Sequence, residues 1–190
     1  ELLKLVTILF AALCVIVPVG AVAEERDLIY TYLGPVGGGG FNHLTYSDWR
    51  NFYKTNKYSG YYANAGLSIW VVSKWLIGDF TAQYQYNNFR SIGIVHNAYF
   101  TISCRIGVRM GGVGSFAPGV GLYVATPPTN RKFRGGAGLR VPLAFMFNTT
   151  FDTMLFIDGS FMYGWYGMGD RSTTMFYGIS LGFIFKVGRI

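Results

Sequence analysis

The chain has 190 residues, of which 18% are aromatic and only 13% charged, against about 25% charged residues in a typical soluble domain. A soluble β-protein needs a polar outer surface, so this shortage of charge argues against one and favours a surface that faces lipid. The net charge of +7 is scattered along the chain rather than gathered in a stripe. It therefore argues against nucleic-acid binding and leaves an anionic envelope surface as the natural neighbour.

Residues 1–23 predict a Sec signal peptide, in which Lys4 precedes an apolar run over 5–17 and small residues precede Glu24. The run is shorter than the roughly 20 residues that a spanning helix needs. We therefore expect export through the Sec pathway, cleavage before Glu24 and a single mature domain over 24–190. Cys104 would be the one cysteine of that domain, so no internal disulfide is expected.

Segments of alternating apolar and polar residues follow, separated by turn residues, and each predicts a β-strand. They lie near residues 28–36, 60–73, 79–88, 96–110, 113–125, 135–147, 152–165 and 173–187. Pro35 interrupts the first segment and Pro118 the fifth, and a proline within a strand requires a bulge or a missing ladder bond. Large apolar faces opposite small or polar ones predict an all-β fold, an eight-stranded antiparallel up-and-down transmembrane β-barrel.

The connections between these strands alternate between short and long, as expected for an even-stranded barrel. We expect the short ones, 74–78, 111–112 and 148–151, in the periplasm, and the longer ones, 41–59, 88–95, 126–134 and 166–172, outside the cell. The first long connection mixes aromatic and cationic side chains, which suits contact with anionic glycans or host proteins. Its candidate contact residues are Tyr46, Trp49, Arg50, Tyr53, Lys54 and Lys57.

The strand faces expected to point inward carry a polar set, namely Arg105, Arg109, Arg140, Asp158, Gln83 and Gln85. Eight strands leave room for little more than side chains, and a buried charge is costly unless it is paired. We therefore expect a plugged polar lumen in which Arg140 lies nearly opposite Asp158 as a cross-strand pair. The other arginines would leave the lumen with a positive excess.

The segment 180–187 fits the pattern polar-x-Gly-x-x-apolar-x-apolar, carried by Ser180, Gly182, Phe185 and Val187. It resembles the β-signal by which the barrel-assembly machinery recognises outer-membrane proteins. With its signal peptide, strand count and length, the whole chain resembles the small eight-stranded bacterial outer-membrane barrels, the group of OmpX, OmpW and the OmpA membrane domain. The resemblance implies a monomer in the bacterial outer membrane, with outer-membrane lipid and the assembly machinery as partners.

The sequence predicts no catalytic residues, no cofactor and no metal site. His43 lies near Ser47 and Asp48 in the first long connection, and His96 begins a strand, but neither matches a catalytic triad or a metal-ligand spacing. We expect a non-enzymatic, surface-exposed structural or adhesin-like interaction protein. Two alternatives stay open: a narrow channel for small hydrophobic molecules or anions, as in OmpW, and a soluble lipocalin-like binder with the two strand faces reversed.

Overall fold

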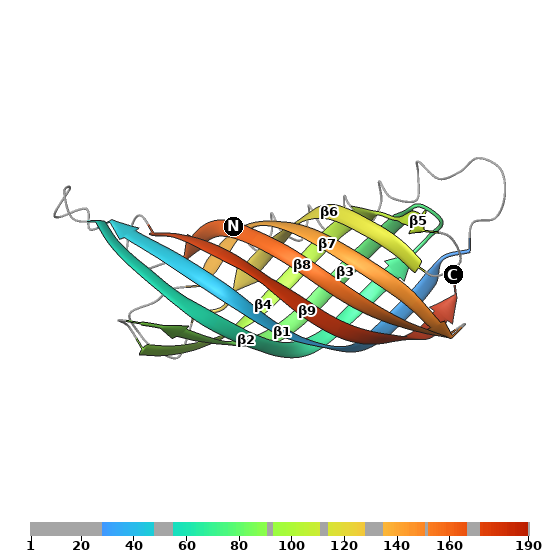
Figure 1. The fold of residues 1–190 in the computed structure, drawn as a ribbon, viewed down its shortest axis with the longest axis horizontal. Coiled ribbons are helices and arrows are strands. Elements are labelled where there is room, and N and C mark those ends of the chain that lie inside the picture. The colour runs from blue at the N-terminus through green and yellow to red at the C-terminus, as the bar shows by residue number, and fades with distance from the viewer. Residues whose placement is uncertain are drawn as a thin grey trace.

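The computed structural model describes residues 28–47, 55–90, 93–110, 114–127, 135–150, 152–166 and 172–189, so the predicted signal peptide lies outside the described residues. Long, steeply tilted antiparallel strands form a closed barrel (Figure 1). The strands are β1 (Tyr30–Ser47), β2 (Thr55–Val72), β3 (Leu76–Phe89), β4 (Gly93–Ile106), β5 (Val108–Met110), β6 (Gly114–Ala125), β7 (Gly136–Thr150), β8 (Thr153–Tyr166) and β9 (Ser172–Arg189). No helix in these ranges is long and apolar enough to cross a membrane.

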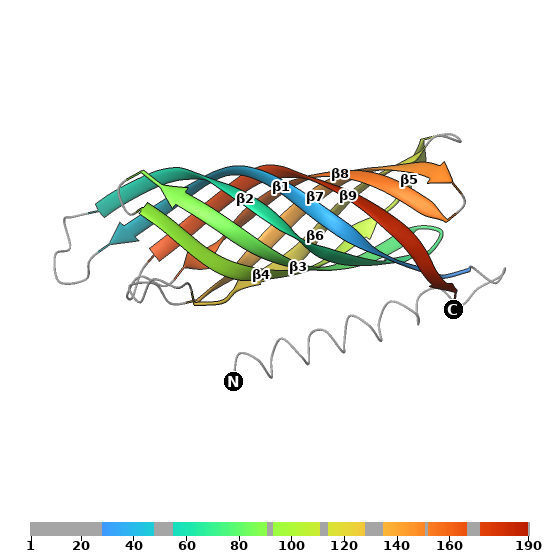
Figure 2. The same ribbon diagram turned by 90° about the horizontal axis from the view of Figure 1, so that it is seen from below.

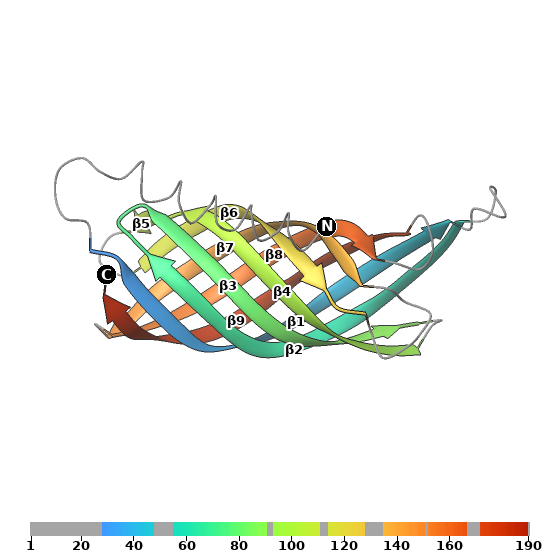
Figure 3. The same cartoon turned by 180° about the vertical axis from the view of Figure 1, so that it is seen from behind.

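Two pairings between strands that are not consecutive in the chain close the barrel. β1 pairs with both β2 and β9 (Figure 2), and β4 lies between β3 and β6 (Figure 3). β4 and β5 are two halves of one strand, because Arg105↔Gly119 and Val108↔Phe116 continue the same register against β6. Among the described residues the barrel therefore has eight staves, and the predicted fold class is confirmed.

Prolines account for the gaps in the ladders. The ladder between β4–β5 and β6 is interrupted at Ile106 and Gly107, which lie opposite Pro118 and Ala117, and Pro118 has no N–H to donate. The β1–β9 ladder likewise lacks pairs between Leu33↔Phe185 and Val36↔Gly182, the stretch that contains Pro35. The expectation that these prolines interrupt pairing is confirmed.

The first hairpin is longer than predicted. β1 and β2 stay paired up to Ser47↔Thr55, so most of the expected connection 41–59 is strand. In Figure 1 the ends of β1 and β2 reach beyond the other strands at one end of the barrel. Backbone pairing does not require alternating hydrophobicity, and this stretch lacks that pattern. The sequence therefore predicted the end of the apolar face rather than the end of the strand.

The two faces of the wall differ in chemistry. On β9, Phe176 and Ile184 point inward and are buried, whereas Leu181, Phe183 and Phe185 point outward and are exposed. The other long strands show the same alternation, with large apolar side chains outside. A soluble barrel with its apolar face inside is therefore excluded, and the lipocalin-like alternative is wrong.

Buried apolar side chains fill both ends of the lumen. We call the end where β1–β2, β3–β4, β6–β7 and β8–β9 are joined the loop end, and the opposite end the turn end. The loop-end core consists of Leu44, Tyr62, Phe89, Val95, Tyr99, Tyr123, Ala125, Met162 and Phe176. The turn-end core consists of Tyr32, Val36, Trp70, Ile77, Ala117, Ala144, Met146, Met154, Phe156 and Ile184.

Candidate functional site: the barrel lumen

Four charged side chains meet in the lumen between the two cores. Arg105 Nε lies 2.7 Å from Asp79 Oδ2, and its two terminal nitrogens bind Asp158 Oδ1 and Oδ2 at 3.0 and 2.9 Å. Arg140 bridges the same two carboxylates, with Nη1 lying 3.0 Å from Asp79 Oδ1 and Nη2 bonded to Asp158 Oδ2. Positive and negative groups therefore alternate around a closed ring, which we call the lumen ion network.

Neighbouring polar and aromatic groups complete the environment of the two arginines. Arg140 Nη1 also donates to Thr101 Oγ1 at 3.1 Å and to Ser103 Oγ at 2.9 Å. The Arg105 guanidinium lies over the Trp70 ring, with its carbon 4.6 Å from the ring centroid. Buried ions are tolerated when geometry and extra hydrogen bonds offset their desolvation, and both arginines meet that condition.

The network has no excess charge, contrary to the sequence prediction. Asp79 was missed, although it shares the inward face of β3 with Gln85, because it was taken as the first residue of its strand. Arg109 was assigned to the lumen, but it is exposed on β5. The register against β6 continues unchanged past Gly107, so Arg109 keeps the facing of Arg105, but it lies at the turn end of the wall, where it is exposed. Two arginines and two aspartates therefore give a neutral lumen centre.

The predicted register of β7 and β8 was also wrong, although the predicted contact forms. Arg140 pairs with Met162 and Ala144 with Asp158, because the turn lies between Thr150 and Thr153 and a bulge follows Asn148. The error is four residues. An even shift leaves every side chain on its predicted face, and the long arginine side chain spans the diagonal to Asp158.

Aromatic rings close the lumen towards the loop end. The Phe176 ring makes edge contacts with Tyr62, Tyr99 and Tyr123 at centroid distances of 5.8, 5.5 and 6.3 Å. Tyr99 and Tyr123 are themselves stacked at 5.8 Å. A Cβ on Gly178 would lie 2.3 Å from the Tyr62 hydroxyl, so only a glycine at this position leaves room for the Tyr62 side chain.

The turn end is filled in the same way. The Trp70 and Phe156 rings lie 4.7 Å apart, and Met146 and Met154 pack in the same core. These inward side chains fill space across the lumen. Gly182 is required here, because a Cβ at that position would lie 2.2 Å from the Phe156 ring.

A second polar group, which we call the amide cluster, lies beside the loop-end core. Asn87 is its centre: its Oδ1 accepts from Asn42 Nδ2 at 2.9 Å and from Gln85 Nε2 at 2.8 Å, and its Nδ2 donates to Asn97 Oδ1 at 3.0 Å. Gln85 is therefore in a lumen network, though not in the ionic one. Gln83 lies on the same face of β3 and is half-buried.

The histidines do not form a triad with the described residues. His43 Nδ1 lies 2.7 Å from Ser59 Oγ across the first hairpin, a partner that the sequence analysis did not consider. The described carboxylates are Asp79 and Asp158 in the lumen and Asp152 at the turn end, so none orients this pair. His96 lies between the rings of Tyr84 and Tyr86. The described ranges contain no cluster of metal-ligating side chains.

The remaining predicted residues are divided between strands and undescribed positions. Tyr46 and Lys57 belong to the paired ends of β1 and β2, whereas Trp49, Arg50, Tyr53 and Lys54 lie outside the described residues. The predicted assembly signal is on β9. There Ser180 and Gly182 face the lumen, and Phe185 and Val187 face outward.

No protein-family model and no curated protein sequence matches the chain. Among solved structures, Neisserial surface protein A aligns over 83% of this chain and 97% of its own, with a TM-score of 0.59 at 12% identity. The outer membrane protein OprG from Pseudomonas aeruginosa aligns over 87% of this chain and 98% of its own, with a TM-score of 0.56 at 11% identity. The fold is that of the small outer-membrane β-barrels. At these identities the likeness of this barrel to the two proteins concerns the fold alone.

Proposed function

We propose that the chain is a non-enzymatic outer-membrane protein whose filled barrel acts as an anchor and whose loop end contacts other molecules. The observation that carries this proposal is the closed lumen: two apolar cores enclose a neutral, fully paired ion network. A permeating ion or solute would have to displace both cores and separate the charges. That is costly in a site of low dielectric.

The outer surface supports a place in a lipid bilayer. The exposed aromatic residues Tyr177 and Phe185 lie eight residues apart on β9, or about 20 Å along the axis of a tilted barrel. The outward side chains between them, Ile179, Leu181 and Phe183, are all large and apolar. This spacing agrees with an apolar band of about 25 Å flanked by aromatic residues.

Contacts with partners would be made at the loop end. The aromatic and cationic residues Trp49, Arg50, Tyr53, Lys54 and Lys57 all belong to the tip of the first hairpin or to its connection. Such a mixture suits anionic glycans or acidic host surfaces, for which electrostatic attraction accelerates encounter. During assembly, the outward Phe185 and Val187 of β9 would serve the barrel-assembly machinery.

Planar-bilayer conductance tests the closed lumen against the channel alternative. We expect purified wild-type protein to give no discrete conductance steps. The positive control combines Asp79→Gly/Arg140→Gly with Trp70→Ala and Phe176→Ala, because it hollows the lumen centre without leaving net charge and also opens both apolar cores. Wild-type steps as large as those of this control would refute the anchor proposal and establish a channel.

A further inference from the structure

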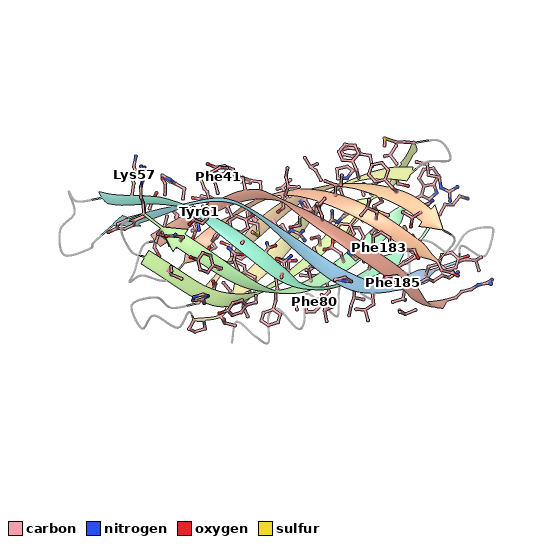
Figure 4. The ribbon with its side chains drawn as sticks, turned by 60° about the horizontal axis from the view of Figure 1, so that its bottom comes forward. Phe41, Lys57, Tyr61, Phe80, Phe183 and Phe185 are labelled. Carbon is pink, nitrogen blue, oxygen red and sulfur yellow. The ribbon has the colours of Figure 1, made fainter. Side chains whose placement is uncertain are left out.

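The outward surface near the tip of the first hairpin carries an aromatic row and, nearer the loop end, polar and cationic rows. Phe41 and Tyr61 are paired across β1 and β2 and are 61% and 53% exposed. Figure 4 shows both beside Lys57 at one end of the barrel, with Phe80, Phe183 and Phe185 towards the other end. We call the surface formed by Phe41, Tyr61, Lys57, Ser59 and Arg90 the rim face.

The aromatic row of the rim face is held in place by neighbouring strands. The Tyr61 hydroxyl accepts a hydrogen bond of 2.7 Å from Asn88 Nδ2 on β3, and the Phe41 ring lies 5.9 Å from that of Tyr177 on β9. Tyr177 marks the loop-end boundary of the apolar band. Phe41 and Tyr61 therefore lie at the border between acyl chains and headgroups.

The next rows towards the loop end are polar and cationic. Ser59 pairs with His43, and its carbonyl accepts the Arg90 backbone N–H at 3.2 Å, so Arg90 continues this row. Lys57 lies two residues further along β2, and both cations are exposed. Lys57 lies four positions from Tyr61, or about 10 Å along the axis, which is headgroup depth.

No described carboxylate neutralises these cations, because the described aspartates lie in the lumen or at the turn end. The structure therefore leaves a cationic patch directly above an aromatic row on the side of the barrel that faces lipid. A soluble anion could reach the cations. A membrane-embedded molecule alone could contact the cations and the outward aromatic row together.

We propose that the rim face binds a phosphorylated glycolipid of the outer leaflet, with its phosphates on Lys57 and Arg90 and its sugar and proximal acyl chains against Tyr61 and Phe41. This inference rests on the proposed membrane location. Cations near an anionic membrane surface each strengthen attraction several-fold, whereas aromatic rings at this depth fix position. The site would give the barrel a preferred lipid neighbour on one side.

Lipid retention by the whole protein tests the proposal. The barrel is folded in vesicles containing diphosphorylated lipid A or its dephosphorylated form, extracted in mild detergent, and the retained lipid is counted by native mass spectrometry. We expect wild-type protein to retain the diphosphorylated form roughly five- to tenfold better, and Lys57→Gln/Arg90→Gln to lose that preference. Arg109→Gln/Arg189→Gln, which removes two exposed cations at the turn end, should retain lipid like the wild type.

Equal retention of the two lipid forms by the wild type would overturn the site, as would an unchanged Lys57→Gln/Arg90→Gln variant or an equal loss in the turn-end control. Tyr61→Ser provides a second variant and should weaken retention of both forms. If a soluble sulfated glycan binds through Lys57 and Arg90 while lipid retention is unchanged, the rim face serves a soluble partner and the lipid proposal fails. Folding is checked by the gel shift between unheated and boiled samples, and conductance is measured separately, so failure of the anchor proposal remains distinguishable.

Discussion

The inside and the outside of this barrel wall obey opposite rules, although successive residues of one strand supply both. On β8, Asp158 points inward and is buried among arginines, whereas its neighbour Ile157 points outward and is exposed. Charge is found inside because each ion there has a partner of opposite sign. The described outward positions between the aromatic rows are apolar because no partner or water is available to them.

The comparison shows that side-chain direction and depth along the strand together decide which substitution the barrel accepts. Inside, the cost of a change is the charge it leaves unpaired. Outside, the cost is the charge it introduces. Substitutions on the two faces should therefore destabilise the barrel for opposite reasons, a lost partner charge inside and an added charge outside, and by different amounts.

The largest effect is expected from Arg105→Met. Arg105 is 1% exposed and binds both carboxylates of the lumen ion network, so its removal leaves two aspartates with one arginine. Breaking a buried pair from one side costs about 3 to 5 kcal/mol. Urea unfolding of the barrel in vesicles measures the loss, and a variant as stable as the wild type would show that the network contributes nothing to stability.

On the outer face, Leu181→Arg should destabilise the barrel by about 2 to 4 kcal/mol if Leu181 lies near the bilayer midplane. Leu181 is 54% exposed, yet the loss comes from charge placed in lipid rather than from lost packing. Val187→Arg is the matched control near the turn end and should cost about 0 to 1 kcal/mol. Equal effects at the two positions would contradict the assigned position of the membrane.

Asp158→Asn should cost about 1 to 3 kcal/mol, because it leaves the lumen with an uncompensated positive charge. The Arg140→Met/Asp158→Leu variant should be less destabilised, since it removes one charge of each sign and keeps the Arg105–Asp79 pair of 2.7 Å. A double-mutant cycle between positions 140 and 158 measures their coupling. Strict additivity would show that the ion pair seen here has no energetic coupling.

The smallest effect is expected at Arg109, which the sequence pattern had placed in the lumen. Arg109 is exposed on β5, so Arg109→Met should change the unfolding free energy by no more than about 0.5 kcal/mol. Arg140→Met is the matched substitution at a buried arginine. A loss at Arg109 similar to the loss at Arg140 would return Arg109 to the lumen interior and contradict its exposure at the turn end.

The fold class and the facing of most strands could be predicted because burial on one side imposes a period of two on the sequence. Thr173 to Val187 carries this signal through almost the whole of β9. The same rule cannot locate strand ends outside lipid, so the paired tips of β1 and β2 were taken for a loop. It also cannot tell how far along the barrel a position lies, which is why Arg109, exposed at the turn end, was placed in the lumen.

The lumen ion network was only partly predictable. The alternation of inward and outward positions assigned Arg105, Arg140 and Asp158 to the interior. The net charge of the network also depends on Asp79, which lies at the edge of a predicted strand and was missed. The partners of Arg105 across the lumen depend on how the sheet closes into a barrel. The alternation of apolar and polar residues along a strand gives no information on that closure. The contact between His43 and Ser59 was also missed, because it requires the long first hairpin, which the sequence did not predict.

Tyr30, the first residue of β1, is paired with Arg189, the last residue of β9, so the first and last strands of the barrel begin and end side by side at the turn end. The ring consequently has no structural beginning. A short linker from Arg189 to Tyr30, with the chain opened instead at residues 111–113 between β5 and β6, would yield a circular permutant that keeps every strand pairing. In such a permutant a different strand would occupy the C-terminus, which separates the stability of the closed sheet from the order in which its strands are delivered to the membrane.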